Sequence, residues 1–265
     1  MAVRPGAEPL THDGDDVGLL LCHGFTGNPS SLRPWAEALV AAGHTVRLPR
    51  LPGHGTTWQE MNRTTWQDWY GEVDAAFTEL RGKVRVLIVG GLSMGGALAL
   101  RLAEQHAGQG GVDGIVLVNP AVGFKPRRGG AAMENPQLRA VPFIRWVMPS
   151  TVAVGGDIKK PGVVEDAYER VPTHALHSFL KFIRLVEADL PTVHQPLLVF
   201  HSPEDHVVPA ASSELILRSV SSKDVTETLL TDSYHVATLD NDAPMIFSDS
   251  LAFAKRISDT AGGSR

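Results

Sequence analysis

The sequence contains a single cysteine, Cys22, among its 265 residues. One cysteine cannot form an internal disulfide, and it excludes a metal site built from several thiolates. Because Cys22 lies in an apolar run, we interpret it as a buried and chemically inert thiol.

Blocks of like charge and long apolar runs are missing as well. The formal net charge is −5, which gives no broad attraction to nucleic acid or to an anionic membrane surface. No run approaches the roughly 18 to 20 apolar residues that a membrane helix needs. Residues 1–11 contain no apolar core of a signal peptide. These absences predict a soluble, cytoplasmic protein without a nucleic-acid partner. No phosphate-binding loop or other cofactor motif is found, so we expect neither a cofactor nor a metal.

Short apolar runs bounded by glycine or proline alternate along the chain with segments of helical spacing. Continuous apolar runs are typical of strands buried on both faces of a parallel sheet, with helices covering those faces. The runs that predict strands are residues 17–23, 45–51, 84–90, 114–119, 196–201 and 225–230. Helical spacing is found at residues 31–42, 65–80, 94–106 and, more weakly, 211–219. The pattern predicts an α/β fold with a mostly parallel sheet of about six strands, and a poor signal at residues 8–11 suggests an extra edge strand.

A long stretch near the middle of the chain breaks this alternation. Prolines, paired glycines and two helix-like segments, residues 161–170 and 174–188, occupy more chain than a simple crossover requires. Open α/β sheets bind ligands outside the carboxyl ends of their strands, so we expect an insertion that covers those ends. The chain is therefore divided into a core of residues 1–122 and 194–265 and a cap of residues 123–193.

Residues 91–95 read Gly-Leu-Ser-Met-Gly and stand between a predicted strand and a predicted helix. This G-x-S-x-G pattern, in this context, is typical of a nucleophilic serine on a tight strand-to-helix turn. A serine hydroxyl is a weak nucleophile and must be presented within reach of a base. Gly91 and Gly95 lack the Cβ atoms that would collide around such a turn. The pattern predicts Ser93 as the nucleophile, in preference to an incidental serine in a glycine-rich turn.

The segment His-Gly-Phe-Thr-Gly at residues 23–27 follows the first long strand. A tetrahedral intermediate needs two backbone N–H groups, one from the residue after the nucleophile and one from a loop of this kind. We expect these donors to be the N–H groups of Met94 and Phe25. His23 is expected to pack under the loop and to fix it, rather than to act as the base.

The acid and the base are predicted from their order along the chain, because eleven histidines compete for the second role. In this arrangement the order is serine, acid, histidine, with the histidine on a loop after the last strand. His235 is the only histidine after that strand and is the predicted base. Asp205 lies on the polar turn after residues 196–201 and is the predicted acid, which would hold the imidazole in the right tautomer. Glu204 is its rival on the same turn, and His206 is expected to be structural.

Five stretches of the sequence resemble the bacterial monoacylglycerol lipase and small carboxylesterase group of α/β-hydrolases. They are LLCHGFTG at residues 20–27, LPRLPGHGT at 48–56, GLSMGG at 91–96, EDHVVP at 204–209 and SYHVATLD at 233–240. The last two are more specific than the serine pattern alone. The resemblance implies an α/β-hydrolase fold with Ser93, Asp205 and His235 as its triad and with Phe25 and Met94 as oxyanion donors.

The same resemblance implies a cap over an apolar acyl tunnel and a small polar pocket for a glycerol head group. Residues 161–169 look like the family segment that contributes an acid to this pocket, which makes Glu165 the expected ligand of glycerol hydroxyls. A solvated charge on a helix is the alternative interpretation of Glu165. Residues 125–140 match the family least well.

The predicted reaction is hydrolysis of carboxylic esters, above all of monoacylglycerols to fatty acid and glycerol, through an acyl-enzyme on Ser93. The alternatives are a general carboxylesterase for short to medium acyl chains and, in another class, a non-catalytic receptor for apolar ligands. The expected partner is a lipid or ester substrate, with transient contact to a lipid interface, and the chain is expected to be a monomer or homodimer. Apolar residues of the cap could line the acyl path, meet the lipid or pack within the cap: Val141, Phe143, Ile144, Trp146, Val147 and Met148.

Overall fold

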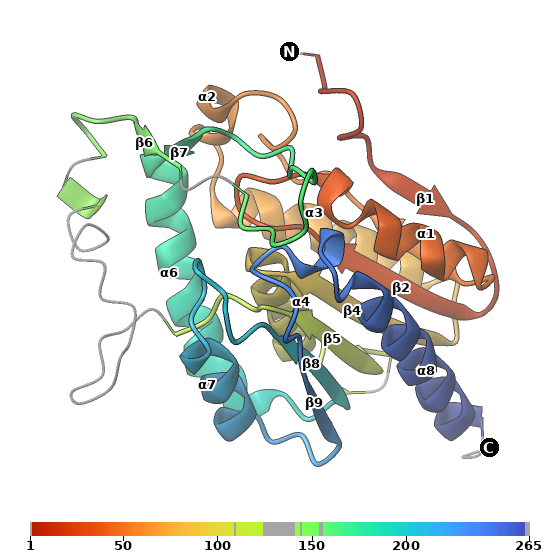
Figure 1. Ribbon diagram of the computed structural model, residues 1–265. Coiled ribbons are helices and arrows are strands. Elements are labelled where there is room, and N and C mark those ends of the chain that lie inside the picture. Colours follow the sequence, from red (N-terminus) through yellow and green to blue (C-terminus); the bar gives the residue numbers. More distant parts are fainter. Residues whose placement is uncertain (1, 109, 124–140, 144, 154–155, 263–265) are drawn as a thin grey trace.

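The computed structural model describes residues 2–108, 110–123, 141–143, 145–153 and 156–262. Within them, a seven-stranded sheet runs through the centre of the molecule in the order β1-β3-β2-β4-β5-β8-β9 (Figure 1). The strands are β1 (Leu10–His12), β2 (Val17–Cys22), β3 (Thr45–Leu48), β4 (Val86–Leu92), β5 (Gly114–Val118), β8 (Leu197–His201) and β9 (Val225–Leu229). β1 is antiparallel to β3, and every other neighbouring pair is parallel.

Helices cover both faces of this sheet. α1 (Arg33–Ala41) and α8 (Ala243–Gly262) lie on one face, where Trp35 and Phe253 are buried in one cluster with Ile88 of β4 (Figure 1). The other face carries α3 (Trp66–Arg81), α4 (Met94–Gln105), α6 (Thr173–Asp189) and α7 (Ala211–Ser219). The apolar side chains of these four helices form a second cluster with Leu20 and Val89. The predicted mostly parallel sheet with helices on both faces is therefore confirmed.

All six predicted strands are present, with small differences at their ends. The strand expected at residues 45–51 ends at Leu48, because Pro49 has no N–H group to donate to a neighbouring strand. The poor signal at residues 8–11 corresponds to β1, an edge strand of three residues.

The C-terminal helix α8 was not predicted from the sequence. Its buried positions recur at intervals of three, four and seven residues, which is the helical period that should have identified it. They are Ala243, Ile246, Ser250, Phe253, Ala254 and Ile257. Serine and alanine at several of these positions weaken the apolar pattern, so the periodicity is faint in the sequence.

Residues 161–170 do not form the predicted helix. They make a turn and an open loop that leads into β7 (Arg170–Pro172). Gly162 has a φ of 80°, outside the right-handed helical region. The Tyr168 N–H group donates to Thr26 O over 3.1 Å, which ties the loop to a segment far away in the sequence. Such tertiary contacts outweigh the local helical spacing, and the helix prediction was wrong.

Between β5 and β8 the described residues also form a small hairpin and short helices. The hairpin pairs β6 (Ser150–Val152) with β7, antiparallel, and lies beside the start of α6 at the top of Figure 1. Of the short helices among the described residues, η2 (Leu190–Thr192) lies in this region, and α2 (Trp58–Met61), η1 (Pro29–Ser31) and η3 (Ala237–Leu239) lie elsewhere in the chain.

The predicted boundaries of core and cap stay a prediction. α6 lies within the expected cap, yet its residues Phe182 and Val186 share one buried cluster with Leu98 of α4. Among the described residues, no helix is long and apolar enough to span a bilayer. The cytoplasmic location also stays a prediction.

Candidate active site

Ser93 lies on the turn between β4 and α4, and its backbone is strained. Its φ of 58° and ψ of −118° fall outside the regions that side-chain-bearing residues favour. A Cβ atom added to Gly95 would come within 1.7 Å of Cys22 O, and one added to Gly91 within 2.3 Å of the Gly95 carbonyl carbon. Glycine is therefore needed at both positions, because β4 and α4 pass so close to the neighbouring strand β2.

Neighbouring backbone groups fix this turn to the next strand of the sheet. The Ser93 N–H group donates to Val118 O at the end of β5 over 3.0 Å. In return, the Ala121 N–H group donates to Ser93 O over 3.1 Å. The serine side chain keeps some access to solvent, since the residue is 8% exposed.

The loop after β2 lies directly against the serine. A Cβ atom added to Gly24 would be 3.6 Å from Ser93 Cβ, so a side chain at this position would already contact the turn. Met94 is the first residue of α4, and the first N–H groups of a helix have no partner within the helix itself. Both predicted oxyanion donors therefore lie in segments that flank Ser93. Phe25 is in the loop after β2, and Met94 is at the start of α4.

Contacts of two aromatic rings, Phe25 and His23, fix the loop after β2. Phe25 stacks on Phe179 of α6 with 5.2 Å between ring centroids. His23 is fully buried, and its Nε2 accepts a hydrogen bond from the Leu51 N–H group over 3.2 Å. Burial lowers the pKa of His23 to about 4, so its ring is neutral near pH 7. This is the supporting position expected of His23.

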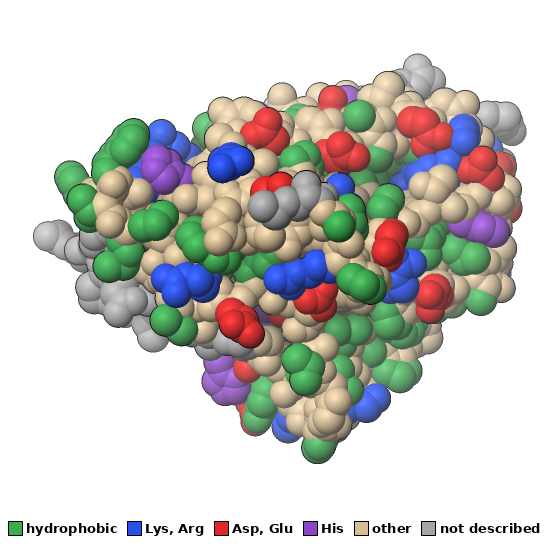
Figure 2. Space-filling view, turned by 90° about the horizontal axis from the view of Figure 1, so that it is seen from above, with side chains coloured by type: hydrophobic (Ala, Val, Ile, Leu, Met, Phe, Trp, Pro, Cys, Tyr) green, Lys and Arg blue, Asp and Glu red, His purple; other side chains and the backbone are tan. Residues whose placement is uncertain are grey.

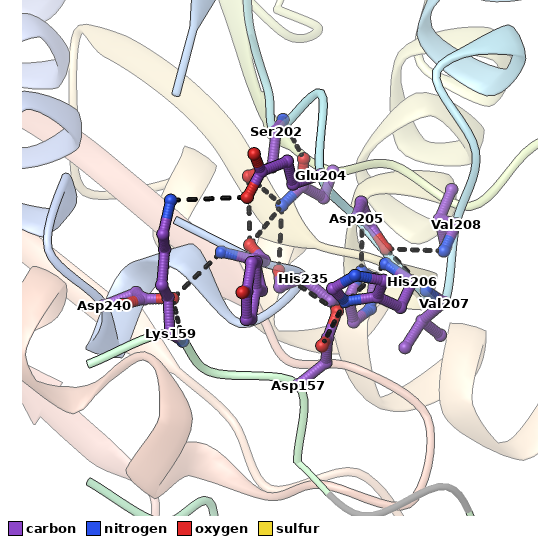
Figure 3. Close-up of polar contacts among 12 residues, drawn as sticks. Asp157, Lys159, Ser202, Glu204, Asp205, His206, Val207, Val208, His235 and Asp240 are labelled. Atoms are coloured by element: carbon purple, nitrogen blue, oxygen red, sulfur yellow. Dashed lines mark hydrogen bonds and ion pairs between the residues drawn. The ribbon is translucent and has the colours of Figure 1, made fainter. Parts of the chain in front are cut away.

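Asp205 and His235 are hydrogen-bonded to each other in a nearly buried pair. His235 Nδ1 lies 2.7 Å from Asp205 Oδ2, and the two side chains are 9% and 1% exposed (Figure 3). Asp205 Oδ1 accepts from the N–H groups of Val207 and Val208, both over 2.7 Å. These three contacts fix the orientation of the carboxylate, which can thereby hold the imidazole in one orientation.

Glu204 does not take this place. Its side chain is 59% exposed and its Oε2 lies 3.3 Å from Lys159 Nζ. His206, on the other side of the acid, is largely exposed and pairs with Asp157, Nδ1 to Oδ1, over 2.8 Å. The choice of Asp205 over its neighbours agrees with these contacts.

Asn119, which the sequence analysis did not identify, connects the segments that carry these groups. Its Nδ2 donates to His235 O over 2.9 Å and to Ser202 Oγ over 3.0 Å, while its Oδ1 accepts from the Ser202 N–H group over 2.8 Å. Its φ of 43° places it on a strained turn directly after β5. A polar residue at the carboxyl end of a central strand was the available signal.

Asp157 was also missed. It accepts a hydrogen bond from the His235 N–H group, although 78 positions separate the two residues. No local pattern in the sequence links them.

Glu165 lies beside the loop after β2. A Cβ atom added to Gly27 would come within 2.9 Å of Glu165 Oε1. Asn28 Nδ2 donates to Asp166 O over 2.6 Å and fixes the segment there. Burial raises the pKa of Glu165; His235 opposes this rise and Asp166 adds to it. Residues 161–169 form a turn and a loop and not a helix, so the alternative of a solvated charge on a helix is wrong.

Of the six apolar cap residues whose role the sequence left open, Val141 is the one that is buried among those that the structure describes. Four others are exposed: Phe143, Trp146, Val147 and Met148. Ile144 lies outside the described residues. Packing within the cap therefore does not account for these four side chains.

The sheet, the strained serine turn and the Asp–His pair define an α/β-hydrolase. A family model described as serine aminopeptidase S33 matches residues 16–242, and the chain belongs to that family. It is 42% identical over 252 residues to a thermostable monoacylglycerol lipase of Bacillus sp. (strain H-257), which covers 95% of both proteins. It is 24% identical to a carboxylesterase of Bacillus subtilis (strain 168), over 94% of this chain and 97% of that protein.

A solved structure described with the metagenome-derived lipolytic enzymes LipS and LipT has the same fold. The TM-score is 0.89 at 41% sequence identity, over 96% of this chain and 100% of that chain. The predicted α/β-hydrolase fold and family resemblance are confirmed by these comparisons.

Proposed function

We propose that this chain hydrolyses monoacylglycerols, with Ser93 as nucleophile, Asp205 as acid and His235 as base. The broader prediction, a serine hydrolase of carboxylic esters, is confirmed by the family and by relatives named for ester cleavage. The observation that carries the catalytic assignment is the 2.7 Å bond between Asp205 and His235, on loops at the same edge of the sheet as the strained Ser93 turn.

In the proposed mechanism, His235 Nε2 takes the hydroxyl proton as Ser93 Oγ attacks the ester carbonyl carbon. Asp205 holds the proton on Nδ1 and stabilises the imidazolium. The backbone N–H groups of Phe25 and Met94 stabilise the oxyanion. The imidazolium then protonates the departing alcohol oxygen. A water molecule, activated by the same histidine, attacks the acyl-enzyme and releases the fatty acid.

We infer that Glu165 binds the glycerol head group of the substrate. Its carboxylate lies near Gly27, two residues after the proposed donor Phe25, which supports a place for the head group beside the proposed oxyanion donors. A carboxylate can accept hydrogen bonds from two hydroxyl groups at once. The burial that raises the pKa of Glu165 would also strengthen hydrogen bonds from glycerol hydroxyls, because fewer water molecules compete for this side chain.

The exposed apolar side chains of the cap support the finer proposal of transient contact with a lipid surface. Trp146 and Val147 are 71% and 84% exposed. Arg145 lies over the Trp146 ring at 4.7 Å, and His174 meets the same ring edge-on. Hydrophobic side chains gather beside basic and histidine side chains at the left end of Figure 2, which is the end that carries β6 and β7. An exposed apolar patch beside Arg145 suits contact with a lipid interface.

The test of the proposed function is hydrolysis of a medium-chain monoacylglycerol beside the matching diacylglycerol, triacylglycerol and methyl ester. We expect preference for the monoacylglycerol and a fall in kcat of about 10⁶-fold in Ser93→Ala, as for loss of a triad nucleophile. Equal turnover of the methyl ester would favour the general carboxylesterase instead. Activity that survives in Ser93→Ala would contradict the mechanism itself.

A further inference from the structure

One carboxylate contacts both of the loops that carry the proposed acid and base. Asp157 Oδ2 accepts from the backbone N–H group of His206 over 3.0 Å and from that of His235 over 3.1 Å (Figure 3). Its other oxygen, Oδ1, lies 2.8 Å from His206 Nδ1. The side chain is only 11% exposed, so water competes little for these bonds.

The rest of the same segment is fastened to the histidine loop as well. Asp157 O accepts from the Val236 N–H group over 3.0 Å. The fully buried Asp240 side chain accepts from the N–H groups of Lys159 and Lys160 over 2.7 and 2.8 Å. Residues 157–160 and residues 235–240 therefore each supply a carboxylate that binds the other's backbone.

We propose that Asp157 is a positioning residue for catalysis, one that holds the acid turn and the base loop at a fixed separation. The proposal rests on the function assigned above to Asp205 and His235. These two residues follow different strands, β8 and β9, so their 2.7 Å bond depends on the relative position of two loops. Asp157 Oδ2 binds the backbone next to the acid and the backbone of the base itself. A shift of either loop must therefore stretch a charge-assisted hydrogen bond.

The molecule also contains an exposed bridge between the same two loops. Lys159 Nζ lies 3.3 Å from Glu204 Oε2 on the acid turn and 3.3 Å from Asp232 Oδ1 on the base loop. Both carboxylates are more than half exposed, and such surface ion pairs contribute little to stability. Lys159→Met thus removes a link between the same loops without touching the buried one, and it is the matched control.

The experiment compares Asp157→Ala, Asp157→Asn and Lys159→Met with the parent enzyme on a soluble medium-chain ester. We expect Asp157→Ala to lower kcat by on the order of 10- to 100-fold, the size of effect that a small misplacement of catalytic groups produces. KM should change little, because the loss concerns the transition state and not the binding of substrate. Lys159→Met should keep the parent kcat.

Asp157→Asn is the conservative variant that tests the contacts separately from the charge. Its amide oxygen can still accept from both backbone N–H groups, so it should restore most of the kcat lost in Asp157→Ala. In proton NMR, the low-field signal of the His235–Asp205 hydrogen bond should be present in the parent and in Asp157→Asn, and weakened or lost in Asp157→Ala. A residue with a merely structural role would leave this signal in place.

Several results would overturn the proposal. They are an unchanged kcat in a folded Asp157→Ala, an equal loss in Lys159→Met, or a fall in kcat with an unaltered low-field signal. Failure of both Asp157 variants to fold would make the residue a part of the fold and not a positioning residue. Failure of the proposed function is distinct, because it appears as a parent enzyme without esterase activity or as activity that survives in Ser93→Ala.

Discussion

The turn that carries Ser93 and the loops that carry Asp205 and His235 are held in place by different means. The serine turn depends on steric fit, because Gly91 and Gly95 leave room for strand and helix to close on each other and on Cys22 of β2. The acid and base loops are fixed by side chains from distant segments, with Asn119 and Asp157 lying 116 and 78 positions away from His235. Steric fit and two backbone hydrogen bonds hold the proposed nucleophile, whereas hydrogen bonds from distant side chains hold the proposed acid and base.

The largest effect is expected from breaking the acid–base pair. Asp205→Asn keeps the shape of the side chain, but its amide stabilises the wrong imidazole tautomer, so kcat should fall by about 10⁴-fold. Steady-state ester hydrolysis measures the change. Glu204→Gln is the matched control on the same turn, and it should stay close to the parent because its carboxylate faces Lys159 and solvent. A greater loss in Glu204→Gln would reverse the assignment of the acid.

The role of steric fit at the serine turn is tested by adding one methyl group to Gly95. Gly95→Ala would place a Cβ atom 1.7 Å from Cys22 O, and we expect it to lower the free energy of unfolding by about 3 kcal/mol and to abolish activity. Gly71→Ala is the control, because this exposed glycine lies inside α3 with no atom near its would-be Cβ. It should raise stability by up to about 1 kcal/mol. Urea denaturation measures both, and a well-tolerated Gly95→Ala would contradict the steric account.

A smaller and substrate-specific effect is expected at Glu165. Glu165→Gln weakens hydrogen bonds from glycerol hydroxyls, which should lower kcat/KM for a monoacylglycerol by about 10-fold. The methyl ester of the same acyl chain should be hydrolysed at the parent rate, since it has no hydroxyl to bind. An equal loss on both esters would mean that Glu165 acts on the catalytic groups and not on the head group.

The smallest effect concerns the dependence of stability on pH. The hydrogen bond to Asp157 raises the pKa of His206 above its ordinary value of 6.5. The folded state therefore binds this proton more tightly than the unfolded state. The resulting stabilisation is complete below pH 6.5 and is lost as the pH rises through the raised pKa.

His206→Gln removes this titration. The parent should be more stable than His206→Gln at acidic pH, and the difference should shrink at alkaline pH to what the ring contact with Tyr234 contributes. Urea midpoints measured from acidic to alkaline pH provide the test. A difference that stays constant, or that grows with pH, would show that the His206–Asp157 pair is not charged as inferred.

Much of the fold and part of the site could be predicted because their causes are local. A buried parallel strand is a run of apolar residues, and the serine turn is a run of five residues whose glycines have a steric role. Asp205 and His235 could be predicted from the order in which strands and loops follow one another. Helix α8 was missed because alanine and serine occupy several of its buried positions, which weakens the apolar periodicity in the sequence.

Other features of the molecule depend on contacts between distant segments of the chain. Residues 161–170 have helical spacing, yet contacts such as the bond from Tyr168 N–H to Thr26 O hold them as a loop. The partners of Asn119 and Asp157 depend on which strands are neighbours in the sheet and on where the segment before β7 lies. The residues next to them in the sequence do not reveal these partners. The strands, the serine turn and the order of the proposed catalytic groups could be predicted from the sequence, since short-range sterics and hydrophobic burial act on adjacent residues. Only the folded chain determined how the acid and base loops are held together, because hydrogen bonds between distant segments form only where folding has already brought their donors and acceptors together.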